Sequence, residues 1–130
     1  MNDPFKTHGA FSWCELMTPD PEAAKHFCGT LFGWTLEDMD VGRGTYTVIK
    51  AGGAGAGIGG IMKRPPECAS DAPPHWGTYV TVEDVDATAR KAEALGAKTL
   101  VPPTDIPKVG RFCMLQDPQG AVIAAITYAT

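Results

Sequence analysis

Glu15 is the residue whose type and position most suggest chemistry in this sequence. It lies in an apolar run, Phe11 to Met17, whose polar interruptions predict a strand. A carboxylate on an apolar strand face should be paired or stand at a functional opening, where it could act as a general base. The alternative, which we prefer, is a structural role: an ion pair with Arg111 or Lys98, or a hydrogen bond to a loop N–H.

Three further side chains are chemical candidates. Arg111 begins a predicted strand and could clamp a carboxylate or phosphate of a ligand, or pair with an acid such as Glu15 or Asp117. Cys113 lies on the same strand face, and a thiol beside a guanidinium can be reactive, although we prefer a packed thiol. His75 follows a proline at the start of a strand, where partial exposure is the ordinary expectation.

The sequence predicts two similar halves that would position these residues. Asp20 and Pro21 should begin one helix and Asp84 another, and glycines at 33 and 96 should end them. One strand precedes each helix and three follow it, and the first strand after the second helix should stop before Pro102-Pro103. The expected strands are 11–17, 34–40, 45–51, 57–62, 76–82, 98–101, 111–116 and 121–128.

We expect one domain over residues 1–130, with module one at 9–62, a Pro-rich linker at 63–74 and module two at 75–128. The Gly-rich run 52–60 lacks the Lys-Ser/Thr ending of a phosphate-binding loop, so a turn leading into a strand explains it better. Four cysteines are scattered without a zinc-type spacing, and we expect Cys14 and Cys28 to pack as small hydrophobes.

The internal duplication predicts an α+β fold. Two βαβββ modules side by side would form a curved eight-stranded sheet around a cavity, with both helices on the convex face. Phe11, Trp13 and Tyr79 would face that cavity, and Val122 and Ile126 would line its other side. An aromatic concavity of this kind suits a small-molecule ligand, although the same side chains could fill it as core.

Composition excludes several other classes of function. The chain has 130 residues, a net charge of −4 and a pI near 5.2, with no basic stripe, so we expect no nucleic-acid partner. No apolar stretch is long enough to span a bilayer, and residues 1–10 lack an apolar signal core. We therefore expect a cytoplasmic protein without a membrane partner.

Four segments are specific enough to indicate a family: TPDPEAAKHFCGTLFGW (18–34), YVTVEDVDATARKAEALGAK (79–98), VPPTDIPKVGRF (101–112) and LQDPQGAVIAAI (115–126). With the paired βαβββ order, they resemble the glyoxalase/bleomycin resistance protein/extradiol dioxygenase (vicinal oxygen chelate) superfamily. They are most similar to the bacterial subgroup related to lactoylglutathione lyase. The resemblance covers nearly the whole chain, but one such fold hosts many reactions.

The resemblance also implies where a metal would stand. Catalytic members hold a divalent ion with His, Glu or Gln side chains on the first and last strands of each half, and these positions fall here on Trp13, Gly77, Ala124 and the stretch 57–60. None of these residues is a suitable ligand, so we predict no metal or other cofactor. A displaced site would use Glu15 and His75, with Cys113 or Asp117 as a further ligand.

Three functions follow as alternatives. The first is a metal-independent small-molecule-binding protein, similar to the drug-sequestering resistance proteins. The second is a metal-dependent lyase or isomerase similar to lactoylglutathione lyase, or a dioxygenase, using the displaced site. The third is a non-catalytic interaction module. The resemblance makes a homodimer the expected assembly, whereas the ligand, any reaction and the sharing of the cavity between swapped chains stay open.

Overall fold

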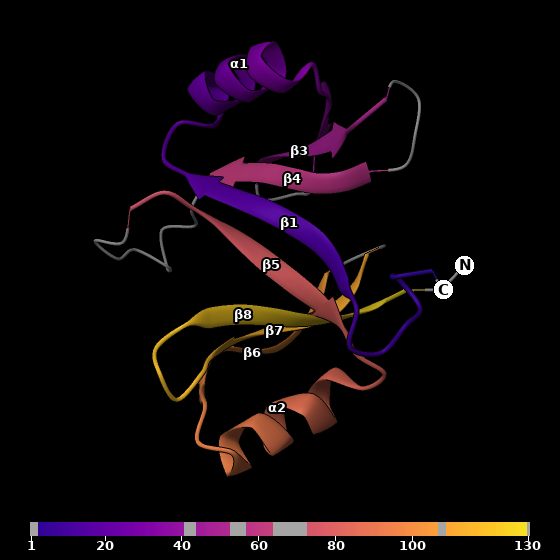
Figure 1. Cartoon of the computed structure of the whole chain (residues 1–130), viewed down its shortest axis with the longest axis vertical. Coiled ribbons are helices and arrows are strands. Elements are labelled where there is room, and N and C mark those ends of the chain that lie inside the picture. Colours follow the sequence, from indigo (N-terminus) through magenta and orange to yellow (C-terminus); the bar gives the residue numbers. More distant parts are fainter. Residues whose placement is uncertain (1–2, 41–43, 53–56, 64–72, 107–108, 130) are drawn as a thin grey trace. The chain divides into compact units, whose positions relative to one another are not determined.

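The computed structural model describes residues 3–40, 44–52, 57–63, 73–106 and 109–129. The predicted order of strand, helix and three strands occurs twice (Figure 1), so the α+β fold of two βαβββ modules is confirmed. The elements are β1 (Phe11–Thr18), α1 (Pro21–Phe32), β2 (Thr35–Asp40), β3 (Thr45–Lys50), β4 (Gly57–Lys63), β5 (His75–Thr81), α2 (Val85–Ala94), β6 (Lys98–Ile106), β7 (Gly110–Gln116) and β8 (Val122–Tyr128).

The chain separates into two compact units, which we describe one at a time. The α1 unit is Trp13–Gly77, and the α2 unit is Met1–Ser12 with Thr78–Thr130. Two strands are divided between them, so Phe11 on β1 belongs to the α2 unit and His75 on β5 belongs to the α1 unit. Most of the predicted linker, residues 64–72 with Cys68, lies outside the described residues, as does 53–56 of the glycine run.

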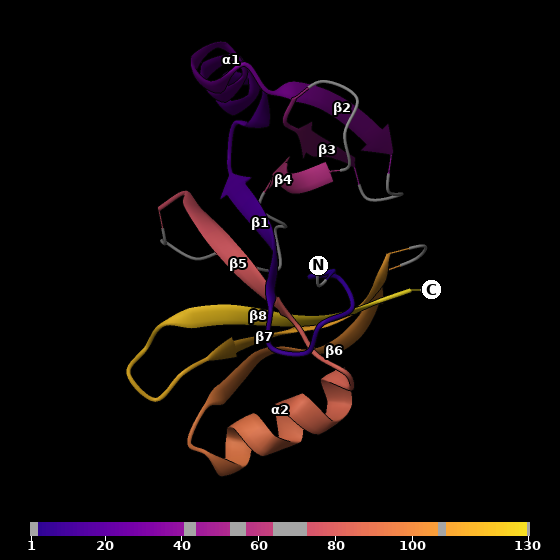
Figure 2. The same ribbon diagram turned by 45° about the vertical axis from the view of Figure 1, so that its right-hand side comes forward.

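In the α1 unit the strands are ordered β2-β3-β4-β1, with β1 and β4 parallel and the other pairs antiparallel. Figure 2 shows β2 beside β3 at the outer edge of this unit. Leu16, Ile49 and Ile61 are buried together against Ala24 of α1, because alternate residues of each strand point to the same face. The helix therefore covers one face of this half-sheet.

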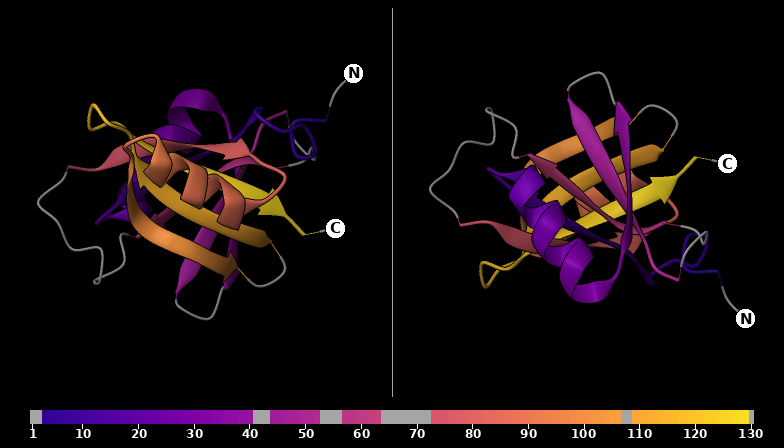
Figure 3. Two further views of the ribbon diagram at one scale, coloured as in Figure 1. Left: turned by 90° about the horizontal axis from the view of Figure 1, so that it is seen from below. Right: turned by 90° about the horizontal axis from the view of Figure 1, so that it is seen from above.

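The α2 unit repeats that arrangement with the order β5-β8-β7-β6, in which β5 and β8 are parallel. Figure 3, left, shows α2 lying across β6, β7 and β8, and the helix contacts all three strands. Its core consists of buried side chains from the helix, from the strands beneath it and from the connection between β5 and α2: Val82, Val85, Ala89, Cys113, Leu115 and Ala125.

The two helices begin in the same way. The side chains of Asp20 and Asp84 accept hydrogen bonds of 3.1 Å from the backbone N–H of Ala23 and Ala87 respectively. The offset in residue number from Asp20 to Asp84 also relates Glu15 to Tyr79 and Gly60 to Ala124. The first pair (Glu15–Gly60) and the second (Tyr79–Ala124) are both Cα partners across parallel strands, so the duplication extends to strand register.

Two sequence-based expectations are wrong. We expected a strand that stops before Pro102-Pro103, but β6 runs through both prolines. It tolerates them because it is the outer strand of its unit and its pairing with β7 shifts register between Thr99 and Thr104. Cys14 is exposed rather than packed, whereas Cys28 is buried as expected. Neither helix in the described part of the chain is long and apolar enough to cross a membrane.

Candidate functional site

The face of the α1-unit sheet that points away from α1 carries the strongest candidate site. Because Leu16 and Ile49 point toward the helix, the residues beside them in the same strands point away from it. Trp13 and Glu15 on β1 therefore share this face with Tyr46 and Val48 on β3. We call the sheet face that a unit's own helix does not cover its open face. The predicted common face of Trp13 and Glu15 is consistent with this pattern of burial.

Trp13 and Tyr46 are joined across this open face. The indole Nε1–H of Trp13 donates a 2.8 Å hydrogen bond to the hydroxyl of Tyr46. Strand β4 lies between β1 and β3, so the two side chains must meet above it. Gly60 of β4 makes this possible, because a Cβ atom at that position would overlap the Tyr46 hydroxyl and ring.

A second glycine of β4 supports the Trp13 ring. A Cβ atom at Gly57 would lie 2.7 Å from Cγ1 of Val48 and 3.1 Å from Cη2 of Trp13. Both distances are too short for an alanine without movement of a neighbour. The glycines at 57 and 60 therefore leave room for a ring pair that a strand of ordinary residues would exclude.

Glu15 and His75 have different surroundings within the α1 unit. Glu15 is buried, with 7% of its surface exposed, and its Cα partner on β4 is Gly60. His75 is exposed, and its Nδ1 lies 3.0 Å from the carbonyl oxygen of Pro73. The exposure of His75 agrees with our expectation, and a displaced metal site that uses this pair stays a prediction.

The α2 unit has its own aromatic pair on the face away from α2. The rings of Tyr79 and Phe112 have centroids 6.3 Å apart and are tilted by 49°. Ala124 and Ile126 are buried on β8 and alternate with Ala125, which packs toward the helix. Two other predicted lining residues are well exposed, Phe11 at 69% and Val122 at 43%.

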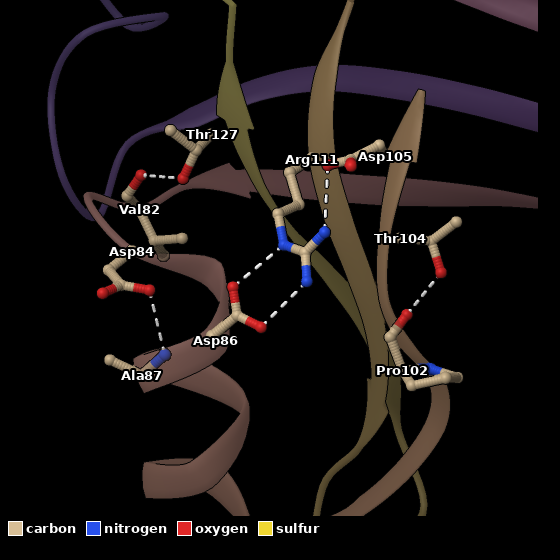
Figure 4. Close-up of polar contacts among 9 residues, drawn as sticks. All are labelled: Val82, Asp84, Asp86, Ala87, Pro102, Thr104, Asp105, Arg111 and Thr127. Carbon is tan, nitrogen blue, oxygen red and sulfur yellow. Dashed lines mark hydrogen bonds and ion pairs between the residues drawn. The ribbon is translucent and has the colours of Figure 1, made fainter. Parts of the chain in front are cut away.

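Arg111 and Cys113 share a strand face as predicted, but it is the face that α2 covers. Figure 4 shows the guanidinium of Arg111 reaching Asp86 of α2 through Nε (2.9 Å) and Nη2 (3.0 Å), and Asp105 of β6 through Nη1 (3.0 Å). The acids paired with Arg111 are thus not those that we named. The hydrogen bonds that Arg111 donates lower the pKa of Asp86, and the same interactions with the Asp86 and Asp105 carboxylates raise the pKa of Arg111.

Cys113 does not have the accessible environment that a thiol activated by Arg111 would need. Its side chain is fully buried in the core beneath α2. Burial raises the pKa of the thiol above its ordinary value, which disfavours the nucleophilic thiolate. The packed thiol that we preferred fits this environment.

The residues at the metal positions implied by the resemblance do not fit a metal ion. Strand register assigns the fourth position to Gly60. Gly60 pairs with Glu15 across β4 and β1, just as Ala124, another of these positions, pairs with Tyr79 across β8 and β5. The set is then Trp13, Gly60, Gly77 and Ala124, which offers no carboxylate, imidazole or amide oxygen. The indole of Trp13 can only donate, and its N–H is bonded to Tyr46.

Sequence reasoning missed Tyr46 and the particular role of Gly60. The signal for Tyr46 was its alternation with Thr47 and Ile49, which places it on the face opposite the core. It also missed a cavity of about 180 Å³ in the α2 unit, lined by Phe5, Lys6, His8, Thr81, Val82, Glu83, Thr127 and Tyr128. Several polar groups there are bonded within the unit, as in the hydrogen bond from Thr81 to the Pro4 carbonyl.

Comparison with known proteins identifies the relatives of this chain. CFP32 of Mycobacterium tuberculosis (strain CDC 1551 / Oshkosh), provisionally named a glyoxylase, is 42% identical over 119 residues, which are 91% of this chain and 44% of that protein. The anthracycline biosynthesis protein DnrV of Streptomyces peucetius is 32% identical over 126 residues, which are 89% of this chain and 46% of DnrV. The chain thus spans less than half the length of these curated relatives.

Solved structures share the fold of this chain. Methylmalonyl-CoA epimerase from Mycobacterium tuberculosis matches with a TM-score of 0.68 at 15% identity, over 96% of this chain and 92% of that one. An extradiol ring-cleaving dioxygenase from B. fuscum matches with a TM-score of 0.63 at 16% identity, over 92% of this chain and 32% of that one. The model of the Glyoxalase/Bleomycin resistance protein/Dioxygenase superfamily matches residues 10–125, and the chain therefore belongs to this superfamily.

Proposed function

We propose that this chain is a small-molecule-binding module of the glyoxalase superfamily that works without the metal of its catalytic relatives. The observation that carries the proposal is the hydrogen bond of 2.8 Å between Trp13 and Tyr46. Trp13 stands at a position where catalytic relatives hold a metal ligand. The only polar group of its ring is the indole N–H, a donor that is already bonded to Tyr46. No step of a metal-assisted reaction can be assigned to these residues.

The ligand that suits this face is flat and largely apolar. Aromatic walls with few polar groups favour stacking on rings, and both units carry an aromatic pair on the face away from their helix. The name of DnrV, a biosynthesis protein for the polycyclic anthracyclines, supports a ligand of that kind. The proposed lining residues are Trp13 and His75 in the α1 unit and, taken separately, Phe11, Tyr79, Val122 and Ile126 in the α2 unit. Arg111 and Cys113 are left out because they lie beneath α2.

A catalytic version of this function would depend on Glu15. Glu15 is buried and lies two residues from Trp13 on β1, where a general base for a lyase or isomerase reaction could act. The glyoxylase name given to CFP32 favours this second candidate. Loss of turnover in a Glu15→Gln variant that still binds ligand would support it, whereas binding without any turnover in the wild-type protein would exclude it.

We also propose that the protein is a homodimer in the cytoplasm. Three large apolar side chains of α1 are exposed, namely Phe27 at 64%, Leu31 at 58% and Phe32 at 57%. Exposed apolar patches of this kind are typical of protein interfaces. Sedimentation over a range of concentrations tests the dimer, and a monomer at every concentration would contradict it.

Elemental analysis of protein purified without a chelator tests the metal-free proposal. We expect no stoichiometric zinc, nickel, iron or manganese, because the donor set at the family positions is absent. One equivalent of any of these metals per chain would overturn the proposal. If the metal content then fell in a Glu15→Ala variant, the displaced site would be supported. If it did not fall, that site would be excluded.

A thermal-shift screen with aromatic metabolites tests ligand binding. A ligand present at about 100 times its Kd should stabilise the folded protein by about 2.7 kcal/mol. An absence of stabilisation across the aromatic compounds would instead favour the non-catalytic interaction module.

A further inference from the structure

We propose that Gly60 determines the ligand specificity of this site, because its missing side chain lets Tyr46 lie across β4 and hold Trp13 as a wall for flat aromatic rings. The inference rests on the proposed binding function and names the class of ligand: planar, conjugated ring systems. It assigns roles to Gly60 and Tyr46 that follow from the geometry of this chain.

Gly60 differs from its neighbour Gly59 in what its missing side chain permits. A Cβ atom at Gly59 would overlap the carbonyl oxygen of Cys14, so that glycine allows the close approach of β1 and β4 backbones. A Cβ atom at Gly60 would instead overlap the hydroxyl and ring of Tyr46. Gly59 therefore serves the strand pairing, whereas Gly60 serves the position of a side chain.

The hydrogen bond between Trp13 and Tyr46 fixes both rings in one arrangement. Strand β1 supplies the indole and β3 the phenol, so neither ring can rotate without breaking the 2.8 Å bond. Rings that are held in place before binding lose little conformational freedom when a ligand stacks on them. The polar edge of the indole is engaged by Tyr46, so Trp13 recognises a ligand through its ring surface.

This arrangement favours flat rings over puckered ones of the same charge. Stacking requires that the ligand approach an aromatic face closely over its whole area, which a saturated ring system cannot do. A side chain at position 60 would displace Tyr46 and release Trp13. The preference for flat rings should then be lost even though the backbone of β4 is unchanged.

The test compares binding of an anthraquinone sulfonate with binding of a decalin sulfonate of equal charge, by calorimetry. We expect the wild-type protein to prefer the anthraquinone, and Gly60→Ala to weaken the binding of the anthraquinone by about tenfold without changing that of the decalin. Gly29→Ala is the matched control, because its Cβ would meet only the end of the flexible Leu36 side chain at 3.3 Å and the Trp34 carbonyl at 3.9 Å.

A second variant keeps the test valid if Gly60→Ala fails to fold. Tyr46→Leu removes the phenol while leaving the glycine in place, and it should lose the same preference for the anthraquinone. In both variants the indole N–H proton resonance of Trp13 should move in the ligand-free spectrum, because its acceptor has moved or gone. Survival of the anthraquinone preference in a folded Tyr46→Leu protein would overturn this inference alone, whereas failure of both probes to bind the wild type would overturn the proposed binding function with it.

Discussion

The open faces of the two units use the same strand positions differently. In the α1 unit Tyr46 lies two residues before Val48, the partner of Gly60, and its hydroxyl accepts the hydrogen bond from Trp13. In the α2 unit the equivalent residue is Phe112, two before Met114, the partner of Ala124. Glycine on the last strand thus accompanies a tyrosine, and alanine accompanies a phenylalanine.

This difference shows how a duplicated fold can divide its tasks. The helix-facing side of each unit keeps one design, an aspartate cap over a small apolar core. The side away from the helix differs between the units. In the α1 unit Gly57 and Gly60 leave room for the hydrogen-bonded Trp13–Tyr46 pair. In the α2 unit Ala124 carries a methyl group at the position of Gly60, and the rings of Tyr79 and Phe112 have centroids 6.3 Å apart.

The largest expected effects lie in the cores beneath the helices, which are built alike in the two units. Ile61 has no exposed surface and Leu115 is 7% exposed, each in the core beneath its own helix. Truncation of either to alanine should lower the free energy of unfolding by about 2–5 kcal/mol, with Ile61→Ala the more severe. Denaturant titration of both variants measures this, and a smaller loss at Ile61 than at Leu115 would contradict the description of the α1-unit core.

The next effect separates the two open faces. Gly60→Ala should lower the free energy of unfolding by about 1–3 kcal/mol, because the added methyl group overlaps the Tyr46 ring. In a Tyr46→Leu background the same change should cost much less, since its obstacle is gone. A cost of Gly60→Ala that is equal in both backgrounds would show that the ring does not need the glycine.

The reverse change in the α2 unit should be milder. Ala124→Gly adds chain flexibility and removes one buried methyl group, so we expect a loss of about 0.5–2 kcal/mol. The chemical shifts of the Tyr79 and Phe112 rings in the nuclear magnetic resonance spectrum should be nearly the same in Ala124→Gly as in the wild type. A large rearrangement of these two aromatic rings would mean that Ala124 positions them as Gly60 is proposed to position Tyr46.

The helix caps should respond alike in both units. Asp20→Ala and Asp84→Ala each remove a 3.1 Å hydrogen bond to a first-turn N–H. Each change should cost about 1 kcal/mol of stability. Thermal unfolding of the two single variants measures the costs, with Asp20→Asn and Asp84→Asn as controls that retain an acceptor. A loss of stability in only one of the two alanine variants would contradict the prediction that the caps contribute equally to the two units.

The smallest expected effect is the pH dependence of stability that arises from one paired carboxylate in each unit. The hydrogen bond from Thr47, followed by that from Lys25, lowers the pKa of Asp38 in the α1 unit, and the hydrogen bonds from Arg111 lower that of Asp86 in the α2 unit. Their stabilisation is present above the unfolded pKa of about 3.9 and is lost as the pH falls through the lower folded values.

Chemical denaturation between pH 5 and pH 2, roughly the range over which these carboxyls protonate, tests this prediction. Asp86→Asn should flatten the acid-dependent loss of stability, and Asp38→Asn should do so independently. A pH dependence that is the same in the wild type and in both variants would exclude these carboxyls as contributors.

The elements could be predicted from the sequence because local signals define them. Asp20 and Asp84 mark the helix starts, and apolar alternation gives the strand faces on which Trp13 and Glu15 lie. The partners of Arg111 could not be predicted, because Asp86 comes from a helix that crosses its strand. Nor could the contact between Tyr46 and Trp13, which depends on strands that are distant in sequence being brought to either side of β4.

Calorimetric titration of the wild-type protein with an anthraquinone sulfonate, before and after exhaustive treatment with a chelator, tests the central claim most directly. If the Trp13 and Tyr46 rings bind the ligand without a metal, the Kd should be the same in both titrations. Binding that disappears after chelation and returns when a single divalent metal is added back would contradict this account.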